Sequence, residues 1–176
     1  MVRQLLLLLL LLGSVAAAAV AAPGADPPQR TVPCAEVIDH PSFPYRGGSQ
    51  PRHRYRLVLG AVSVPPAYLE QVSETGERPW THFAKHGLVA GSGDQPVTIT
   101  VPPAWRQIVG IVWGNAGNGI FHTIRLAACP WTPIRGNAYA GGFYLRRPSA
   151  CVPLVFSVGG RSATVRFGVG KRCPSR

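Results

Sequence analysis

The chain has 176 residues, of which 18 are Lys or Arg and 7 are Asp or Glu, so its formal net charge is +11 at pH 7. Apart from its first residues it contains no long apolar run, which excludes a membrane-spanning helix from the rest of the chain. The part beyond those first residues has the length of one ordinary domain.

The beginning of the chain predicts export. A short basic segment is followed by an uninterrupted apolar run over residues 5–20, and Ala19-Val20-Ala21 supplies the small–x–small pattern that a signal peptidase recognises. The run is shorter than the about 20 residues that a transmembrane helix needs. We therefore expect a signal peptide over residues 1–21, a flexible leader over 22–33 and a single domain over 34–176, in a protein that is secreted, extracellular or associated with the cell envelope.

Short strands separated by Gly and Pro are predicted for the rest of the chain, because apolar and polar residues alternate with a period of two. After a loop over residues 41–53, strands are expected at 55–61, 97–101, 108–113, 121–128, 143–146, 152–158 and 161–169. Residues 67–72, after two prolines, form the one helical segment expected. This pattern predicts an all-β fold, an antiparallel β-sandwich with an immunoglobulin-like arrangement as one form, and a small barrel as the alternative.

The last two expected strands form a hairpin around Gly159-Gly160, a favourable two-residue turn. Closing the hairpin there puts six apolar residues on one face, as a half-buried hairpin requires. They pair as Phe156 with Ala163, Leu154 with Val165, and Val152 with Phe167. In this register Cys151 faces Gly168, and Cys173 lies five residues out of register.

Four cysteines, Cys34, Cys129, Cys151 and Cys173, lie outside the expected signal peptide. An even number in an exported chain predicts two disulfides, and the lack of a C-x-x-C spacing argues against a metal site. The four residues allow three pairings. Because the hairpin register disfavours a bond between Cys151 and Cys173, we expect Cys34–Cys173 and Cys129–Cys151.

Charge is distributed unevenly along the chain. Every acid lies before residue 95, whereas residues 95–176 contain nine Arg, one Lys and no acid. This imbalance predicts either a basic surface that keeps the protein soluble or attraction to a polyanion. The candidate anion-binding residues are Arg125, Arg135, Arg146, Arg147, Arg161, Arg166, Lys171 and Arg172. The expected partner is an anionic envelope polymer or another protein, with no specific nucleic acid; the sequence does not indicate an oligomeric state.

Signatures of catalysis and metal binding are weak. His82 and His86 would share one face of a helix, but the glutamate of H-E-x-x-H is missing, and on a strand the two would lie about 13 Å apart. Ser92 lies in a Gly-Ser-Gly-Asp segment that is typical of a turn and does not match G-x-S-x-G. Residues 114–119 resemble a phosphate loop only superficially and favour a hairpin turn. We expect no catalytic residue, no metal and no cofactor.

Aromatic residues are dense between residues 105 and 144. Trp131, Tyr139 and Tyr144 lie among hydrogen-bonding groups and are candidates for stacking on sugar rings or anchoring a protein partner; the other interpretation is that they fill the core. The leading prediction is a non-enzymatic binding or structural module that associates with an anionic envelope component or a partner protein. The alternative is a carbohydrate-recognition module or a secreted hydrolase.

The C-terminal segment carries a resemblance to a known group. Its residues Gly141-Gly142-Phe143-Tyr144-Leu145, Cys151-Val152-Pro153-Leu154, Val158-Gly159-Gly160-Arg161, Arg166-Phe167-Gly168-Val169-Gly170 and Cys173 resemble the ends of small exported, disulfide-containing proteins of unknown function from high-GC Gram-positive bacteria. The resemblance implies an exported protein and carries over no functional residue.

Overall fold

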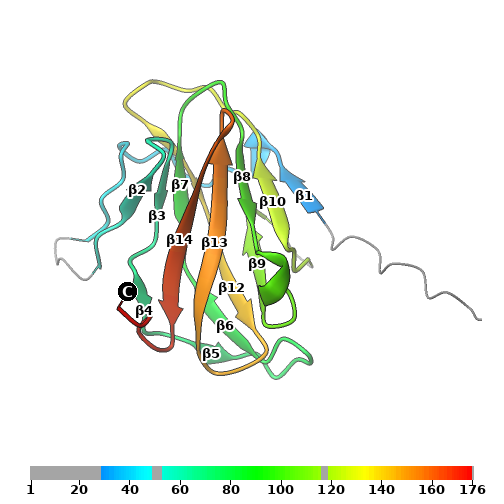
Figure 1. Ribbon diagram of the computed structural model, residues 1–176. Coiled ribbons are helices and arrows are strands. Elements are labelled where there is room, and N and C mark those ends of the chain that lie inside the picture. The colour runs from blue at the N-terminus through cyan, green and yellow to red at the C-terminus, as the bar shows by residue number, and fades with distance from the viewer. Residues whose placement is uncertain (1–28, 49–52, 116–118, 176) are drawn as a thin grey trace, which may run out of the picture.

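The computed structural model describes residues 29–48, 53–115 and 119–175, and this part of the chain is nearly all β (Figure 1). The expected signal peptide and residues 22–28 of the expected leader lie outside the described residues, as do parts of the loop at 41–53 and of the turn at 114–119. The end of the expected leader is strand β1 (Gln29–Val32), so the ordered fold begins earlier than the sequence predicts.

The largest sheet has six strands in the order β1-β10-β8-β13-β14-β4. The five partners of β1 are β10 (Thr123–Leu126), β8 (Val97–Thr100), β13 (Ala150–Val158), β14 (Arg161–Val169) and β4 (Tyr68–Leu69). Alternation decides which side chains point inward: in β8, Val97 and Ile99 are buried, whereas Thr98 and Thr100, which alternate with them, are half-buried.

Two four-stranded sheets form the opposite layer, with orders β11-β7-β3-β2 and β5-β6-β12-β9. The first contains β11 (Gly136–Tyr139), β7 (Leu88–Gly91), β3 (Val62–Val64) and β2 (Arg56–Val58). The second contains β5 (Ser73–Glu74), β6 (His82–Lys85), β12 (Gly141–Leu145) and β9 (Val109–Trp113). The all-β, antiparallel sandwich is confirmed, although β1 and β4 pair in parallel with β10 and β14.

Aromatic side chains fill the space between the layers. Phe143 of β12 lies 5.2 Å from Phe167 of β14 and 5.6 Å from Trp113 of β9, measured between ring centroids, and all three side chains are fully buried. The contact between Phe143 and Phe167 therefore joins the two layers through the core.

The predicted C-terminal hairpin is confirmed residue by residue. Val152 pairs with Phe167, Leu154 with Val165 and Phe156 with Ala163. Both turn residues, Gly159 and Gly160, have positive φ angles of 54° and 77°, which glycine adopts without strain.

The predicted disulfide pairing is wrong: the bonds are Cys34–Cys129 and Cys151–Cys173. The first bond follows from the parallel pairing of β1 with β10, in which Val32 is opposite Leu126. The chain leaves both strands at the same end of the sheet, so the cysteines two and three residues further on meet. The sequence interpretation missed this because it placed β1 in a flexible leader.

The second bond forms although Cys151 does face Gly168, as expected. After β14 the chain reverses at Gly170, whose φ is +66°, and passes over Gly168. A Cβ on Gly168 would lie 2.3 Å from the carbonyl oxygen of Lys171, so the missing side chain is what lets the tail come this close. The reversal brings Cys173 to a Cα–Cα distance of 5.0 Å from Cys151.

The helix expected over residues 67–72 is wrong. Tyr68 and Leu69 form β4, an edge strand held by the hydrogen bonds Gly168 N–H to Ala67 O (2.7 Å) and Gly170 N–H to Leu69 O (2.8 Å). Leu69 is fully buried in the core. Pairing with β14 and burial of one side chain outweigh the local helical preference of so short a segment.

Candidate functional site

The predicted anion-binding residues are all exposed, but they do not form one surface. Arg125 lies on the outer face of β10, whereas Arg135 precedes β11 and donates a hydrogen bond to the carbonyl oxygen of His40 (3.1 Å). Arg146 follows β12, and its guanidinium lies 4.6 Å from the ring centroid of Trp80. Arg161, at the start of β14, donates to the carbonyl oxygen of Leu59 (3.0 Å).

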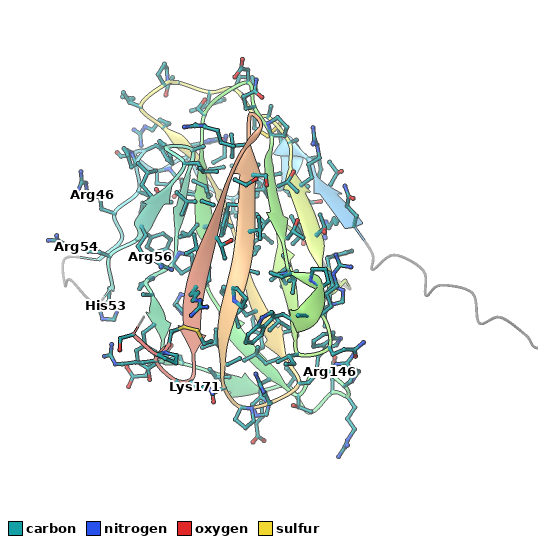
Figure 2. All side chains as sticks on the ribbon, in the orientation of Figure 1. Arg46, His53, Arg54, Arg56, Arg146 and Lys171 are labelled. Atoms are coloured by element: carbon teal, nitrogen blue, oxygen red, sulfur yellow. A yellow bond between two sulfur atoms is a disulfide. The ribbon has the colours of Figure 1, made fainter. Side chains whose placement is uncertain are left out.

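A cleft of about 850 Å³ gathers one of the predicted residues, Arg172, with basic residues that the sequence analysis does not name. It lies where the segment that enters β2, the β4 edge strand and the C-terminal tail meet. Figure 2 shows Arg54, Arg56 and His53 on this side of the molecule. Its charged or titratable lining residues are Arg54, Arg56 and Arg172, with His53, His86, Tyr55, Tyr68 and a single carboxylate, Glu70.

Arg56 is the anchored cation of the cleft. Its Nε–H donates to the carbonyl oxygen of Pro65 and its Nη1 to that of Arg166, both at 3.3 Å. The guanidinium lies 4.8 Å from the ring centroid of Phe167. Its Nη2 is buried without a hydrogen-bond partner, and burial lowers the pKa of Arg56. A buried N–H group without an acceptor costs about 1–3 kcal/mol, so an anionic oxygen that reached this group would be stabilised.

Arg172 enters the cleft from the other side, on the tail that the Cys151–Cys173 disulfide holds. Its guanidinium lies 4.7 Å from the ring centroid of Tyr68. A smaller hollow of about 340 Å³ shares Tyr68 and Arg172 with the cleft and adds Arg166. The basic surface therefore continues from the cleft along the end of β14.

Neutral groups complete the wall. Burial, followed by the neighbouring Tyr45, raises the pKa of Tyr55 to about 12, and its hydroxyl donates to the carbonyl oxygen of Gly87 (3.0 Å). Burial lowers the pKa of His86, which favours the neutral imidazole at neutral pH. The positive charge of the cleft is therefore carried mainly by arginine.

These arginines have no acidic partner in an ion pair among the residues that the structure describes. Within the described ranges, no carboxylate forms an ion pair with Arg54, Arg56 or Arg172, whereas Arg30 pairs with Glu36 at 2.5 Å beside β1. The positive charge of these three arginines is therefore not neutralised by a described carboxylate and can attract an anionic ligand.

Sequence reasoning found only one edge of this cleft. It named Arg172, and Arg166 beside it, but missed Arg54 and Arg56 because the charge imbalance directed attention to the second half of the chain. The signal was present: Arg54 and Arg56 are two residues apart, a spacing that places side chains on one face of an extended segment.

The three candidate aromatic residues differ in their exposure to solvent. Tyr139 is 1% exposed and belongs to the core, so it is not available for recognition. Tyr144 packs against Phe83 with 4.6 Å between ring centroids. Trp131 is 59% exposed, and it is the one of the three that presents its ring to solvent.

Metal and nucleophile candidates do not assemble into a site. His82 lies on β6, as the strand interpretation predicts, and the part of the chain that the structure describes contains no group of three or more His, Cys, Asp or Glu placed to hold a metal. The Ser92 hydroxyl accepts a hydrogen bond from the backbone N–H of Trp131, which gives it a structural role in the loop.

Across residues 29–48, 53–115 and 119–175, no helix has the length and apolar character needed to cross a membrane. The case for the cleft as a functional site rests on its shape and charge. Comparisons of the chain with protein-family models, with curated proteins and with solved structures found no match.

Proposed function

We propose that this protein is an exported, non-enzymatic binding module that holds an anionic partner in the cleft between β2, β4 and the C-terminal tail. The observation that carries the proposal is the set of three arginines, Arg54, Arg56 and Arg172, around one cleft without an ion-paired carboxylate. The ligand class is a phosphate- or carboxylate-bearing polymer of the cell envelope, or an acidic segment of a partner protein.

Export is part of the proposal and is supported by two independent features. The first residues have the pattern of a signal peptide, and both disulfides of the fold are of the kind that persists in oxidising compartments. The resemblance of the C-terminal segment to small exported proteins points the same way.

The chemistry of the cleft favours binding over hydrolysis. Glycoside hydrolysis uses a pair of carboxylates, and Glu70 is the one carboxylate among the described residues that line the cleft. Arginine suits the binding role because its planar group donates two parallel hydrogen bonds to phosphate or carboxylate. Arg56 and Arg172 each lie over an aromatic ring, which restricts the motion of these two side chains. Binding of a ligand therefore costs less side-chain conformational entropy.

The test compares two double variants that lose the same net charge. Arg54→Gln/Arg172→Gln removes two cations of the cleft, and Arg125→Gln/Arg147→Gln removes two exposed cations elsewhere. Retention on immobilised polyphosphate is measured between 0.01 M and 1 M salt, since the Debye length falls from about 30 Å to about 3 Å over this range. We expect the cleft variant to lose about tenfold or more in affinity at low salt, and the control to lose much less.

Equal losses in the two variants would show that binding follows net charge, and would refute the cleft as the site. A parent protein that is not retained at low salt would refute anion binding altogether. Vesicles with and without an anionic headgroup, tested in parallel, separate a polymer ligand from a lipid surface.

A further inference from the structure

We propose that a second, uncharged pocket beside the Cys34–Cys129 disulfide binds one neutral pyranose ring. The pocket has a volume of about 280 Å³ and is lined by this disulfide, Val37, His40, Trp131 and Asn137. It shares no lining residue with the basic cleft, so this activity goes beyond the proposed function.

Trp131 provides the platform. It lies between β10 and β11, in the segment drawn in yellow at the top of Figure 1, and its side chain is 59% exposed. Its ring is nearly parallel to that of His40, with 4.4 Å between centroids and 8° between planes. The backbone N–H of Trp131 donates to the Ser92 hydroxyl. The indole is therefore fixed before a ligand arrives, and its flat apolar surface suits the C–H groups on one face of a sugar ring.

Asn137 provides the polar contact. It lies on β11 and is only 2% exposed. Its Nδ2 donates to the carbonyl oxygen of Cys129 at 2.7 Å, whereas its Oδ1 is buried without a hydrogen-bond partner. Asn137 is among the residues that line the pocket, and buried polar atoms are nearly always paired, so its unpaired acceptor indicates a missing donor. A sugar hydroxyl or the N–H of an N-acetyl group would supply it.

The surroundings select a neutral ligand of limited size. His40 Nδ1 lies 3.3 Å from the carbonyl oxygen of Gly136, a contact in which Nδ1–H donates because a carbonyl oxygen can only accept. Among the described residues that line the pocket there is no carboxylate and no Lys or Arg. Its volume is at the lower end of small-ligand sites, which fits one ring and not an extended chain.

The experiment uses the full mature chain labelled with ¹⁵N and a panel of neutral probes: methyl α-glucoside, methyl α-mannoside, methyl β-galactoside and N-acetylglucosamine. We expect at least one probe to shift the indole N–H signal of Trp131 and the side-chain amide signals of Asn137, with a dissociation constant in the millimolar range. Trp131→Ala should weaken this binding about tenfold or more, because an exposed aromatic anchor carries much of the contact.

Ile134→Ala is the matched control, since Ile134 is 72% exposed in the same loop and does not line the pocket. Both replaced side chains are exposed, so both variants should fold. The inference is overturned if no probe shifts the two sets of signals at millimolar concentration, as a fixed water on Asn137 Oδ1 would predict, or if Trp131→Ala binds as tightly as the parent. Sugar binding should be insensitive to salt and to Arg54→Gln/Arg172→Gln. A negative result for sugar binding would therefore not bear on the cleft, and a negative result for the cleft would not bear on sugar binding.

Discussion

The two disulfides lie beside two surfaces of opposite character. Cys151–Cys173 spans 22 residues and holds a short tail whose Arg172 faces the basic cleft. Cys34–Cys129 spans 95 residues and forms part of the wall of a pocket without acidic side chains, Lys or Arg. Cys34–Cys129 thus joins distant parts of the chain, whereas Cys151–Cys173 positions a single side chain, that of Arg172. We therefore expect Cys34–Cys129 to contribute more to stability and Cys151–Cys173 to contribute more to anion binding.

The largest expected effect concerns stability. Each disulfide stabilises the fold by reducing the conformational entropy of the unfolded chain. The expected stabilisation is about 4.7 kcal/mol for Cys34–Cys129 and about 3.4 kcal/mol for Cys151–Cys173. Cys34→Ala/Cys129→Ala should therefore lower the free energy of unfolding more than Cys151→Ala/Cys173→Ala does, as measured by urea denaturation. The reverse order would contradict the assignment of the first bond as the main global restraint.

Binding should show the opposite order. Removal of Cys151–Cys173 frees the tail that carries Arg172, so polyphosphate retention at low salt should fall by about tenfold, the loss also expected when Arg172 itself is among the residues replaced. Removal of Cys34–Cys129 should leave this retention unchanged in the folded fraction. Equal retention by both variants would show that the tail does not contribute to the cleft.

A smaller effect is expected at the crossing of the tail over β14. Gly168→Ala places a methyl group against the backbone of Lys171, so the tail has to move away from β14. Overpacking of this kind lowers the free energy of unfolding by about 1–3 kcal/mol. Gly93→Ala is the control, because nothing lies within 4 Å of a Cβ built there. Denaturant unfolding measures both, and a Gly168→Ala variant as stable as the control would show that the tail can move at no cost.

The smallest effect is a dependence of stability on pH at the cleft. Burial lowers the pKa of His86 in the folded protein, so the unfolded chain binds a proton more readily below about pH 6.5. The free energy of unfolding should therefore decrease as the pH falls from 7 to 5. His86→Gln should reduce this decrease because it removes the titrating imidazole. It keeps the backbone hydrogen bonds, in which the His86 N–H donates to Gly141 O and the His86 carbonyl accepts from the Trp113 indole.

His122 contributes in the same direction, since burial and the charge of Arg106 lower its pKa. The double variant His86→Gln/His122→Gln should therefore have a flatter profile than either single variant. A parent whose unfolding free energy is unchanged between pH 7 and pH 5 would contradict both assignments.

The sequence predicts what is local. The hairpin around Gly159-Gly160 and the strand at 97–101 follow from turn chemistry and from a period of two, and both are found. What it misses depends on contacts between distant segments. Tyr68 and Leu69, within the segment expected to be helical, form a strand because β14 pairs with them, and the disulfides depend on β1 and on the reversal at Gly170.

The same reason limits the prediction of the site. The charge imbalance correctly selects basic residues, but only the fold shows that Arg172 meets Arg54 and Arg56, which are more than a hundred residues away in the chain. The exposure of Trp131 and the burial of Tyr139 also depend on packing that no local pattern reveals.

The position of β2 has a consequence for how copies of this protein meet one another. β2 is the last strand of its sheet, and it carries Leu57, which is 49% exposed. An edge strand with an apolar side chain invites pairing with a second molecule. Arg54 and Arg56 both lie just before Leu57 in the chain, so two such edges would bring four positive charges together. The arginines proposed to bind an anion therefore also oppose edge-to-edge association, and this opposition weakens at high salt, where their repulsion is screened.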